Sequence, residues 1–161
     1  MAFENPRTAD PLRFLPGEVI VKGAERPWRR SGEKAEYKLL HIDFHTGRWV
    51  TLDRFQEGMK IFKHLHKAPI EGYCISGSFT FRENHIISAG DYFYEPAGAL
   101  HPEATALEDG TLIFGIYHGP LEFLDEEGNS VQTLDWEWFL NEEMGAGGFL
   151  PFNAAAGDPL A

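Results

Sequence analysis

The chain has 161 residues, of which 43% are hydrophobic and 24% are charged, and its formal net charge is −11. This composition is ordinary for a soluble globular protein, and the length suits one domain with a packed core better than two. The strong negative charge would repel a nucleic-acid backbone and an anionic membrane, so the sequence argues against both as partners.

Cysteine content and hydropathy bear on the compartment. Cys74 is the only cysteine, so no disulfide can form within the chain, and its apolar neighbours predict a buried, unreactive thiol. The first residues lack the apolar stretch of a secretory signal, and no run approaches the length of a membrane span. We therefore expect a cytoplasmic protein.

Short apolar runs alternate with turn residues along most of the chain, which predicts an all-β sandwich or barrel. Strands are expected at residues 18–22, 36–44, 49–55, 58–66, 71–76, 79–82, 85–88, 91–95, 111–117, 121–124 and 130–134. Gly47 supplies the tight turn between the second and third of them. We divide the chain into an N-terminal arm with a first strand (1–35), a barrel (36–134) and a C-terminal helix and tail (135–161).

A single segment has a helical pattern, at residues 134–144. Trp136, Phe139 and Leu140 repeat at the spacing of an amphipathic helix, and Asp135 is a suitable N-cap. The aromatic face of this helix fits either closure of one barrel end or an interface between copies of the chain. We expect a homodimer or a homotetramer, and the sequence leaves both open.

The first chemical signal is the pair His64 and His66, separated by one residue. Side chains at i and i+2 of a strand point to the same face, with Cα atoms about 6.5 Å apart. Both imidazoles can therefore lean onto one cation. A pair of this kind also arises by chance, so its meaning depends on the residues around it.

The surrounding residues form two frames of fixed spacing. The first frame consists of Gly58, His64, His66, Glu71 and Gly77. The second frame consists of Gly90, Pro96, Gly98 and His101. Together they resemble the two motifs of the cupin superfamily, except that Thr105 stands where an asparagine is common. The resemblance implies a jelly-roll barrel in which His101 joins the first two histidines at one metal ion, with coordination positions left open.

The fourth ligand is left open between two carboxylates. Counted forward from His66, Glu71 fits the position of the glutamate that the superfamily often uses, but counted back from Gly77 that position falls on Ile70. A shift of one residue turns a strand side chain to the opposite face. Glu83 is the competing candidate, because it shares a face with two phenylalanines on the next strand.

Two further residues are candidates for the catalytic site. Glu95 directly precedes Pro96 and lies six residues before His101, so its carboxylate could accept a hydrogen bond from a ligand histidine and fix its tautomer. Phe62 shares the face of His64 by strand parity and is the best candidate for the cavity wall.

The stretch SAGDYFYEPAGALH at residues 88–101 carries a closer resemblance. Together with residues 71–83 and 119–129, it is similar to the cupins that cleave acetylacetone or 2,4'-dihydroxyacetophenone with O₂, and more distantly to the cupin domain of an anti-sigma factor. The resemblance covers most of residues 36–140. It implies an Fe(II) dioxygenase, with the metal on His64, His66 and His101, that cleaves a C–C bond of a small diketone or hydroxyketone.

Two other functions remain compatible with the same barrel, because fold does not fix function. One is a metal-dependent isomerase or lyase, which would work without O₂. The other is a zinc-binding sensor or ligand-binding module, which the anti-sigma resemblance suggests. Zn, Ni or Mn are accordingly expected alternatives to Fe(II) in the purified protein.

Overall fold

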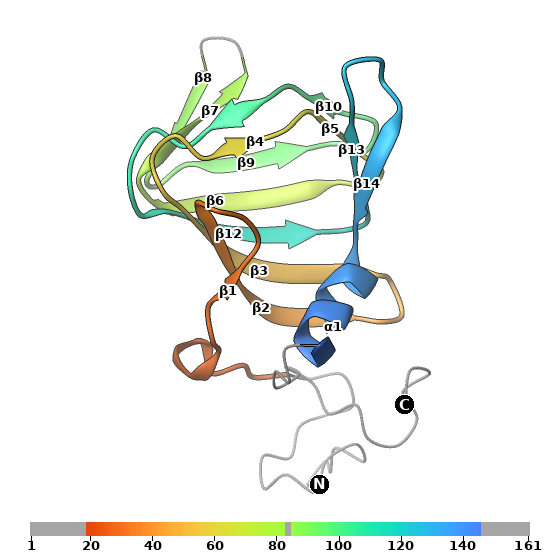
Figure 1. Cartoon of the computed structure of the whole chain (residues 1–161). Helices are drawn as coiled ribbons and strands as arrows, with labels where there is room; N and C mark the ends of the chain where they lie inside the picture. Colours follow the sequence, from red (N-terminus) through yellow and green to blue (C-terminus); the bar gives the residue numbers. More distant parts are fainter. Residues whose placement is uncertain (1–18, 83–84, 146–161) are drawn as a thin grey trace, which may run out of the picture.

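The computed structural model describes residues 19–82 and 85–145, and these form an antiparallel β-structure with one α-helix (Figure 1). A short 3-10 helix, η1, spans Gly23–Glu25, and the α-helix, α1, spans Trp136–Gly145. The strands are β1 (Arg29–Arg30), β2 (Ala35–Asp43), β3 (Arg48–Phe55), β4 (Lys60–Ile61), β5 (His64–His66), β6 (Ile70–Ser76), β7 (Ser78–Arg82), β8 (His85–Ser88), β9 (Tyr92–Glu95), β10 (Leu100–His101), β11 (Ala104–Thr105), β12 (Thr111–Tyr117), β13 (Leu121–Leu124) and β14 (Ser130–Leu134). The predictions of an all-β fold and of a short C-terminal helix are confirmed.

Two main sheets form the jelly roll. The larger sheet has the order β1-β2-β3-β12-β6-β9, and the smaller one has the order β10-β5-β13-β14. Two small ladders, β4 with β11 and β7 with β8, complete the upper part of the barrel in Figure 1. Neighbours in this order are mostly distant in sequence, so residues from separate segments meet on the inner surface.

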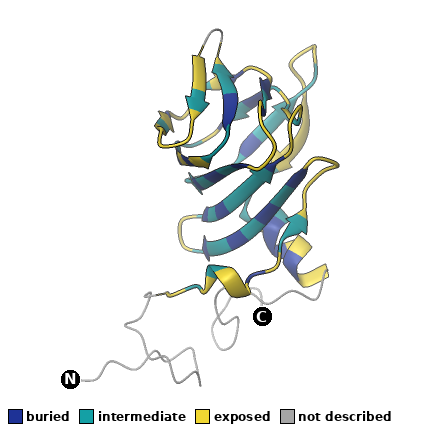
Figure 2. Cartoon of the chain, turned by 90° about the vertical axis from the view of Figure 1, so that its left-hand side faces the viewer, coloured by how far each residue is buried: buried dark blue, intermediate teal, exposed yellow. Residues whose placement is uncertain are grey.

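Alternation along the strands separates an inner from an outer surface (Figure 2). One apolar cluster contains Phe55, Cys74, Phe79 and Ile113, and the thiol is fully buried as the sequence predicts. Cys74 Sγ lies 3.4 Å from the carbonyl oxygen of Ser76. The hydrophobic effect on these side chains holds the two sheets together.

A second apolar cluster explains the C-terminal helix. Phe139 and Leu140 of α1 are 4% and 6% exposed and pack against Tyr37 and Trp49 of the large sheet. The carboxylate of Asp135 accepts a hydrogen bond from the Trp138 backbone N–H at 3.0 Å, as expected of an N-cap. The aromatic side of the helix therefore covers the barrel.

A buried ionic cluster ties the N-terminal segment to the helix. Glu143, 1% exposed, accepts hydrogen bonds from Arg26 at 3.3 Å and from Arg29 at 2.8 Å. The Arg26 Nε–H also donates to the carbonyl of Leu39 at 3.1 Å. Glu143 thus holds strand β1 in a region that the local sequence predicts to be a loop, a contact over more than 100 residues that local patterns do not reveal.

Two predicted strands differ in the structure. Residues 19–22 form no strand, and Glu18 lies outside the described residues. The predicted strand at 58–66 is divided into β4 and β5, because β4 pairs with β11 whereas β5 pairs with β10 and β13. The chain passes from one ladder to another at Phe62–Lys63, so strand parity does not continue across that point.

The glycines of the predicted motifs hold turns. Gly77 has φ 71° between β6 and β7, and a Cβ there would lie 2.7 Å from the Thr111 Cα, so no side chain fits. Gly98 has φ 83° and its N–H donates to the carbonyl of His66 at 2.8 Å. This bond attaches the second motif directly to the first. Among the residues that the structure describes, no helix is long and apolar enough to cross a membrane.

Candidate metal centre

Strand β5 turns two histidines into the barrel. His64 and His66 are 5% and 1% exposed, whereas Leu65 between them faces the other way. Their ring centroids lie 4.9 Å apart. The two side chains therefore lie on the same face of the strand, as the i, i+2 spacing predicts.

His101 reaches the same place through strand pairing. Strand β10 pairs antiparallel with β5, and His101 stands opposite His64 in the register. The His101 ring centroid lies 5.1 Å from that of His64 and 6.0 Å from that of His66. The structure thus brings together the three imidazoles that the sequence motifs single out.

Hydrogen bonds to backbone carbonyls set the tautomers of two rings. His64 Nδ1 lies 2.7 Å from the Phe62 carbonyl oxygen and His101 Nδ1 lies 2.6 Å from that of Pro102. A carbonyl only accepts, so each Nδ1 carries the proton and each Nε2 presents a lone pair. Both ring nitrogens of His66 are buried, and neither has a hydrogen-bond partner among the residues that the structure describes.

Burial keeps all three rings neutral. Desolvation, the largest cause in each case, lowers the pKa of His64 to about 4 and that of His66 to about 3. The pKa of His101 is lowered for the same reason. Neutral imidazole is the form that binds a metal ion, so no proton has to leave the rings near neutral pH.

Glu95 faces two of the three rings from strand β9. Its Oε1 lies 3.6 Å from His101 Nε2 and 3.9 Å from His66 Nε2, and the residue is 4% exposed. Arg82 Nη2 donates to its other oxygen, Oε2, at 3.4 Å. Burial raises the pKa of Glu95 to about 7, although Arg82 opposes the shift.

The contact between the Glu95 carboxylate and His101 Nε2 brings one hydrogen-bond acceptor to another. His101 Nε2 has no proton to donate in the tautomer that Pro102 selects, and an ionised carboxylate has none either. Lone pairs that face each other in a buried site are stabilised when a proton or a cation lies between them. Three neutral nitrogens and one carboxylate oxygen are a donor set that suits Fe, Zn, Ni or Mn.

The rings are not yet in the geometry of a bound ion. Their planes lie within 4° to 11° of parallel, and the described residues contain no three His, Cys, Asp or Glu side chains already arranged to hold a metal. Metal–nitrogen bonds of about 2.0–2.1 Å require the Nε2 atoms to converge. Rotation about χ2, a soft torsion for histidine, is the movement that would bring them together.

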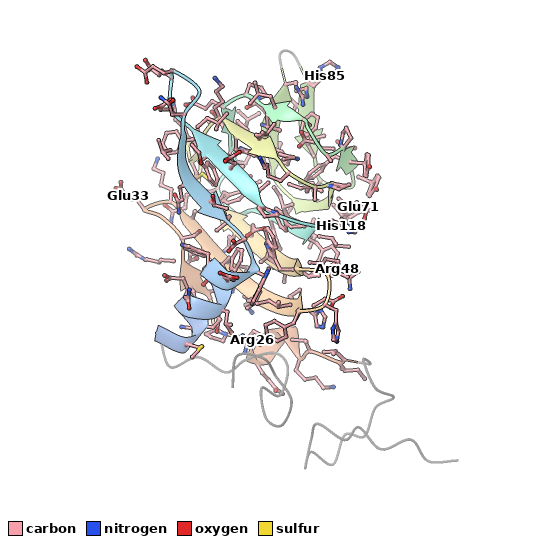
Figure 3. All side chains as sticks on the ribbon, turned by 90° about the vertical axis from the view of Figure 1, so that its right-hand side faces the viewer. Arg26, Glu33, Arg48, Glu71, His85 and His118 are labelled. Atoms are coloured by element: carbon pink, nitrogen blue, oxygen red, sulfur yellow. The ribbon has the colours of Figure 1, made fainter. Side chains whose placement is uncertain are left out.

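The structure places Glu71 away from these rings. Ile70 is buried inside the barrel, and Glu71 lies on the outer face of β6. Its two oxygens accept hydrogen bonds from Tyr92 Oη and from His118 Nε2, both at 2.9 Å (Figure 3). The inward position on β6 is therefore Ile70, as the count back from Gly77 predicts, and not Glu71, as the count forward from His66 predicts. Glu83, the other candidate carboxylate, lies outside the described residues.

The aromatic wall differs from the one that parity suggests. Phe62 is 62% exposed, and it contributes its backbone carbonyl to His64 rather than its ring to the interior. Phe81 and Phe123 approach the centre instead, with ring centroids 5.2 Å from His101 and 5.3 Å from His64. Phe123 stands opposite His64 in the β13–β5 register, a long-range pairing that the local sequence does not reveal.

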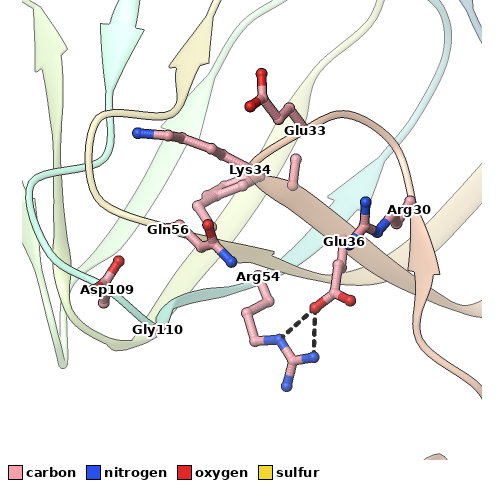
Figure 4. Close-up of a pocket in the computed structure, with 10 residues that line it drawn as sticks. Arg30, Glu33, Lys34, Glu36, Arg54, Gln56, Asp109 and Gly110 are labelled. Carbon is pink, nitrogen blue, oxygen red and sulfur yellow. Dashed lines mark hydrogen bonds and ion pairs between the residues drawn. The ribbon is translucent and has the colours of Figure 1, made fainter.

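Two pockets of about 490 Å³ open on the surface. One is polar, lies at the β2–β3 end of the barrel and shares no residue with the histidine cluster (Figure 4); Arg54 and Glu36 form an ion pair there. The other is lined by Lys63, Arg82, His85, Leu100 and Pro102. Lys63, Leu100 and Pro102 are sequence neighbours of His64 and His101, and Arg82 contacts Glu95, so the second pocket borders the candidate centre.

Comparison with known proteins places this geometry in a family. The model of the ChrR Cupin-like domain matches residues 16–122. An acetylacetone dioxygenase from Acinetobacter johnsonii is similar in structure with a TM-score of 0.73 and 22% identity, over 80% of this chain and 92% of that chain. An RmlC-like cupin protein from Ralstonia eutropha JMP134 has a TM-score of 0.71 and 26% identity, over 81% of this chain and 90% of that chain.

A further similar structure is a complex of two proteins. The anti-sigma ChrR in complex with SigE from Rhodobacter sphaeroides gives a TM-score of 0.50 and 16% identity, over 58% of this chain and 49% of that chain. No curated protein matches the chain by sequence. Because the family model covers more than half of the chain, the protein belongs to the family of ChrR cupin-like domains, and its barrel is a cupin barrel.

Proposed function

We propose that the protein is a mononuclear non-haem Fe(II) dioxygenase that cleaves a C–C bond of a small diketone or hydroxyketone. The observation that carries the proposal is the contact of the buried Glu95 carboxyl with His101 Nε2, a nitrogen with no proton to donate, beside three neutral imidazoles. The fold similarity to an acetylacetone dioxygenase makes an oxidative reaction the first one to test.

His64, His66 and His101 would hold the metal through Nε2. The carbonyls of Phe62 and Pro102 fix the orientation of two of these rings. Bound Fe(II) would supply a centre at which a chelating substrate and O₂ meet and electrons pass to O₂. For a diketone, both oxygen atoms enter the products, a carboxylic acid and a second carbonyl compound, so no further reductant is needed.

The remaining residues prepare the substrate. Glu95 is the carboxylate within reach of a proton that a diketone loses on forming its enolate, and Arg82 holds its second oxygen. Phe81 and Phe123 flank the histidines and limit the access of water. The pocket at Lys63, Arg82 and Leu100 would be the side from which a substrate approaches.

The test combines metal analysis with oxygen consumption. Protein loaded anaerobically with Fe(II) should retain about one iron per chain and consume O₂ in the presence of pentane-2,4-dione or a hydroxyacetophenone. The His101→Ala variant should do neither, whereas His118→Ala, on the outer surface, should behave as the wild type. A full panel of diketones and hydroxyketones without oxygen uptake by iron-loaded protein would contradict the proposal, and turnover without O₂ would indicate an isomerase or lyase.

A second candidate is a metal-binding sensor, which membership in the ChrR cupin-like family favours. Its centre would bind Zn(II) in preference to Fe(II) and would turn nothing over. Competition between the two metals for the metal-free protein, followed by elemental analysis, separates this function from the first.

A further inference from the structure

A polar cluster on the inner wall of the barrel takes no part in the candidate metal centre. Asp53 Oδ2 accepts hydrogen bonds from Thr51 Oγ1 at 2.7 Å and from Tyr117 Oη at 3.0 Å. The three residues belong to β3 and β12, neighbours in the large sheet. A carboxylate inside an apolar barrel costs free energy to bury, and the stability of the fold does not require one there.

The barrel makes room for this cluster by means of paired glycines. Gly115 stands between Tyr117 and Asp53 on the inner face, and a Cβ there would lie 2.6 Å from the tyrosine ring. Its neighbour in the register is Gly72, where a Cβ would lie 2.1 Å from the ring of Phe93. Because the two glycines have no side chains, the rings of Tyr117 and Phe93 can lie against the wall of the barrel. In this position the Tyr117 hydroxyl reaches Asp53.

The cluster faces the same interior as the metal centre. Tyr117 pairs with Ile70, and Ile70 pairs with Glu95, so these three residues form one row across adjacent strands. Two strand spacings separate the Cα atoms of Tyr117 and Glu95 by about 10 Å. The Glu95 carboxylate is one of the charges that raise the pKa of Tyr117, after burial and Asp53.

Asp53 has an oxygen to offer. Both hydrogen bonds fall on Oδ2, so within the described residues Oδ1 receives none. Asp53 and Tyr117 lie deep in the barrel, yet each keeps a partly exposed surface. Burial raises the pKa of Asp53 to about 6, so near neutral pH the group is a carboxylate that only accepts hydrogen bonds.

We propose that Asp53 is a recognition group of the barrel interior and that its Oδ1 accepts a hydrogen bond from a hydroxyl or amino group of a bound small molecule. Thr51 and Tyr117 hold the carboxylate by its other oxygen, and the Trp49 ring, stacked on Tyr117 at 5.0 Å, holds the tyrosine. The inference rests on the proposed function only in taking this molecule to be the substrate, whose reacting end would lie at the histidines.

The experiment uses two probes that share a para-methylated benzene ring with one oxygen substituent, and neither of them can chelate a metal. Binding of p-cresol, which donates a hydrogen bond, is compared with binding of 4-methylanisole, which only accepts one, by amide-shift titration of the full chain in NMR. The wild type should bind p-cresol about tenfold more tightly, with shifts centred on Thr51, Asp53 and Gly115.

Asp53→Asn gives the decisive comparison. The asparagine carbonyl can accept the bonds from Thr51 and Tyr117, which leaves its NH₂ group toward the interior as a donor. The ratio of the two dissociation constants should therefore fall to about one or invert. Asp109→Asn, on the polar surface pocket, is the matched control and should keep the wild-type ratio.

Three results would overturn the inference: an unchanged ratio in Asp53→Asn, shifts that lie away from β3 and β12, or no binding of either probe by the wild type. If Asp53→Asn does not fold, the wild-type ratio and its shift map still decide, and Tyr117→Phe should retain the preference for the donor. Because neither probe needs the metal or O₂, a failure here is distinct from a failure of the dioxygenase assay.

Discussion

Two glutamates on neighbouring strands lie beside histidines on opposite surfaces of the barrel. Glu71 on β6 stands next to Tyr94 in the register, one position from the pair formed by Ile70 and Glu95. Outside, Glu71 accepts a hydrogen bond from His118, and that bond, followed by one from Tyr92, lowers its pKa. Inside, burial raises the pKa of Glu95 to about 7.

The difference lies in what each histidine offers. His118 Nε2 can donate to Glu71, so this outer pair is complete as it stands in water. His66 and His101 present Nε2 to Glu95 Oε1 at 3.9 and 3.6 Å. The ring proton of His101 lies on Nδ1, which donates to the Pro102 carbonyl at 2.6 Å, so its Nε2 has none for Glu95. The inner pair is completed by a proton on Glu95 or by a bound cation. The same residue types therefore form a surface contact on one face and a candidate metal centre on the other.

The largest effect is expected when a histidine is removed from the inner surface. His101→Ala takes away one of three nitrogen donors, and we expect the affinity for Fe(II) or Zn(II) to fall by more than about 100-fold, beyond the cost of losing a supporting group. Metal titration of the chelator-treated protein measures the loss. His118→Ala removes a histidine from the outer surface and should leave the affinity unchanged; equal losses in both variants would remove the contrast between the two surfaces.

The next effect separates charge from shape at Glu95. In Glu95→Gln the amide NH₂ can donate to His66 or His101, so the metal-free protein should unfold at a higher temperature than the wild type. Metal affinity should fall by about 10- to 100-fold, because the negative charge is lost. Calorimetry of metal-free and metal-loaded protein measures both quantities. If the unfolding temperature of the metal-free protein and the metal affinity both rise, or both fall, Glu95 does not face a cation.

The sequence was sufficient to predict that the three histidines lie together, but not how Glu95 faces two of them. His64 and His66 follow from strand alternation, and His101 follows from motif spacing, because these patterns depend on local geometry. The role of Glu95 depends on which residues β9 meets across the barrel, so the sequence indicated a hydrogen-bonding role where the structure places Oε1 3.6 Å from His101 Nε2. Glu71 met the forward spacing and still lies outside, because one position along a strand reverses the face.

Two elements of the fold show the same limit. The strands β2, β3, β6 to β9 and β12 to β14 lie near their predicted positions, since alternation and turn glycines define them, whereas β10 and β11 were not predicted. The strand at Arg29–Arg30 depends on Glu143, more than 100 residues away, and the division of β4 from β5 depends on their different partners. Phe62 was assigned to the cavity wall by parity across that division, and it is 62% exposed.

A third carboxylate, Asp53, extends the comparison to stability. Burial raises its pKa from 3.8 to about 6, so between these values the folded state holds a proton that the unfolded state has lost. Stability from this group is therefore present below pH 3.8 and is lost as the pH rises toward 6. We expect Asp53→Asn to gain about 1–2 kcal/mol relative to the wild type over this interval, less than the full shift because the residue is partly exposed.

Urea unfolding at a series of pH values measures this difference. The wild-type curve alone is not informative at its acid end, because carboxylates with lowered pKa values, such as Glu122 and Asp125, gain stability as the pH rises toward their ordinary pKa values. Subtracting it from the Asp53→Asn curve cancels those contributions. A constant difference between pH 4 and pH 6.5 would mean that Asp53 is solvated like a surface carboxylate.

The smallest effect is expected at Glu71. Its pKa is lowered, so its contribution to stability is present above the ordinary carboxylate pKa and is lost as the pH falls. Solvent screens this exposed pair, so Glu71→Gln should unfold at nearly the wild-type urea concentration at pH 7. Metal content should be unchanged, because Glu71 and the three imidazoles lie on opposite surfaces of the barrel wall. If Glu71→Gln loses metal while Glu95→Gln retains it, the assignment of inner and outer carboxylates is reversed, and the forward count from His66 was the correct register after all.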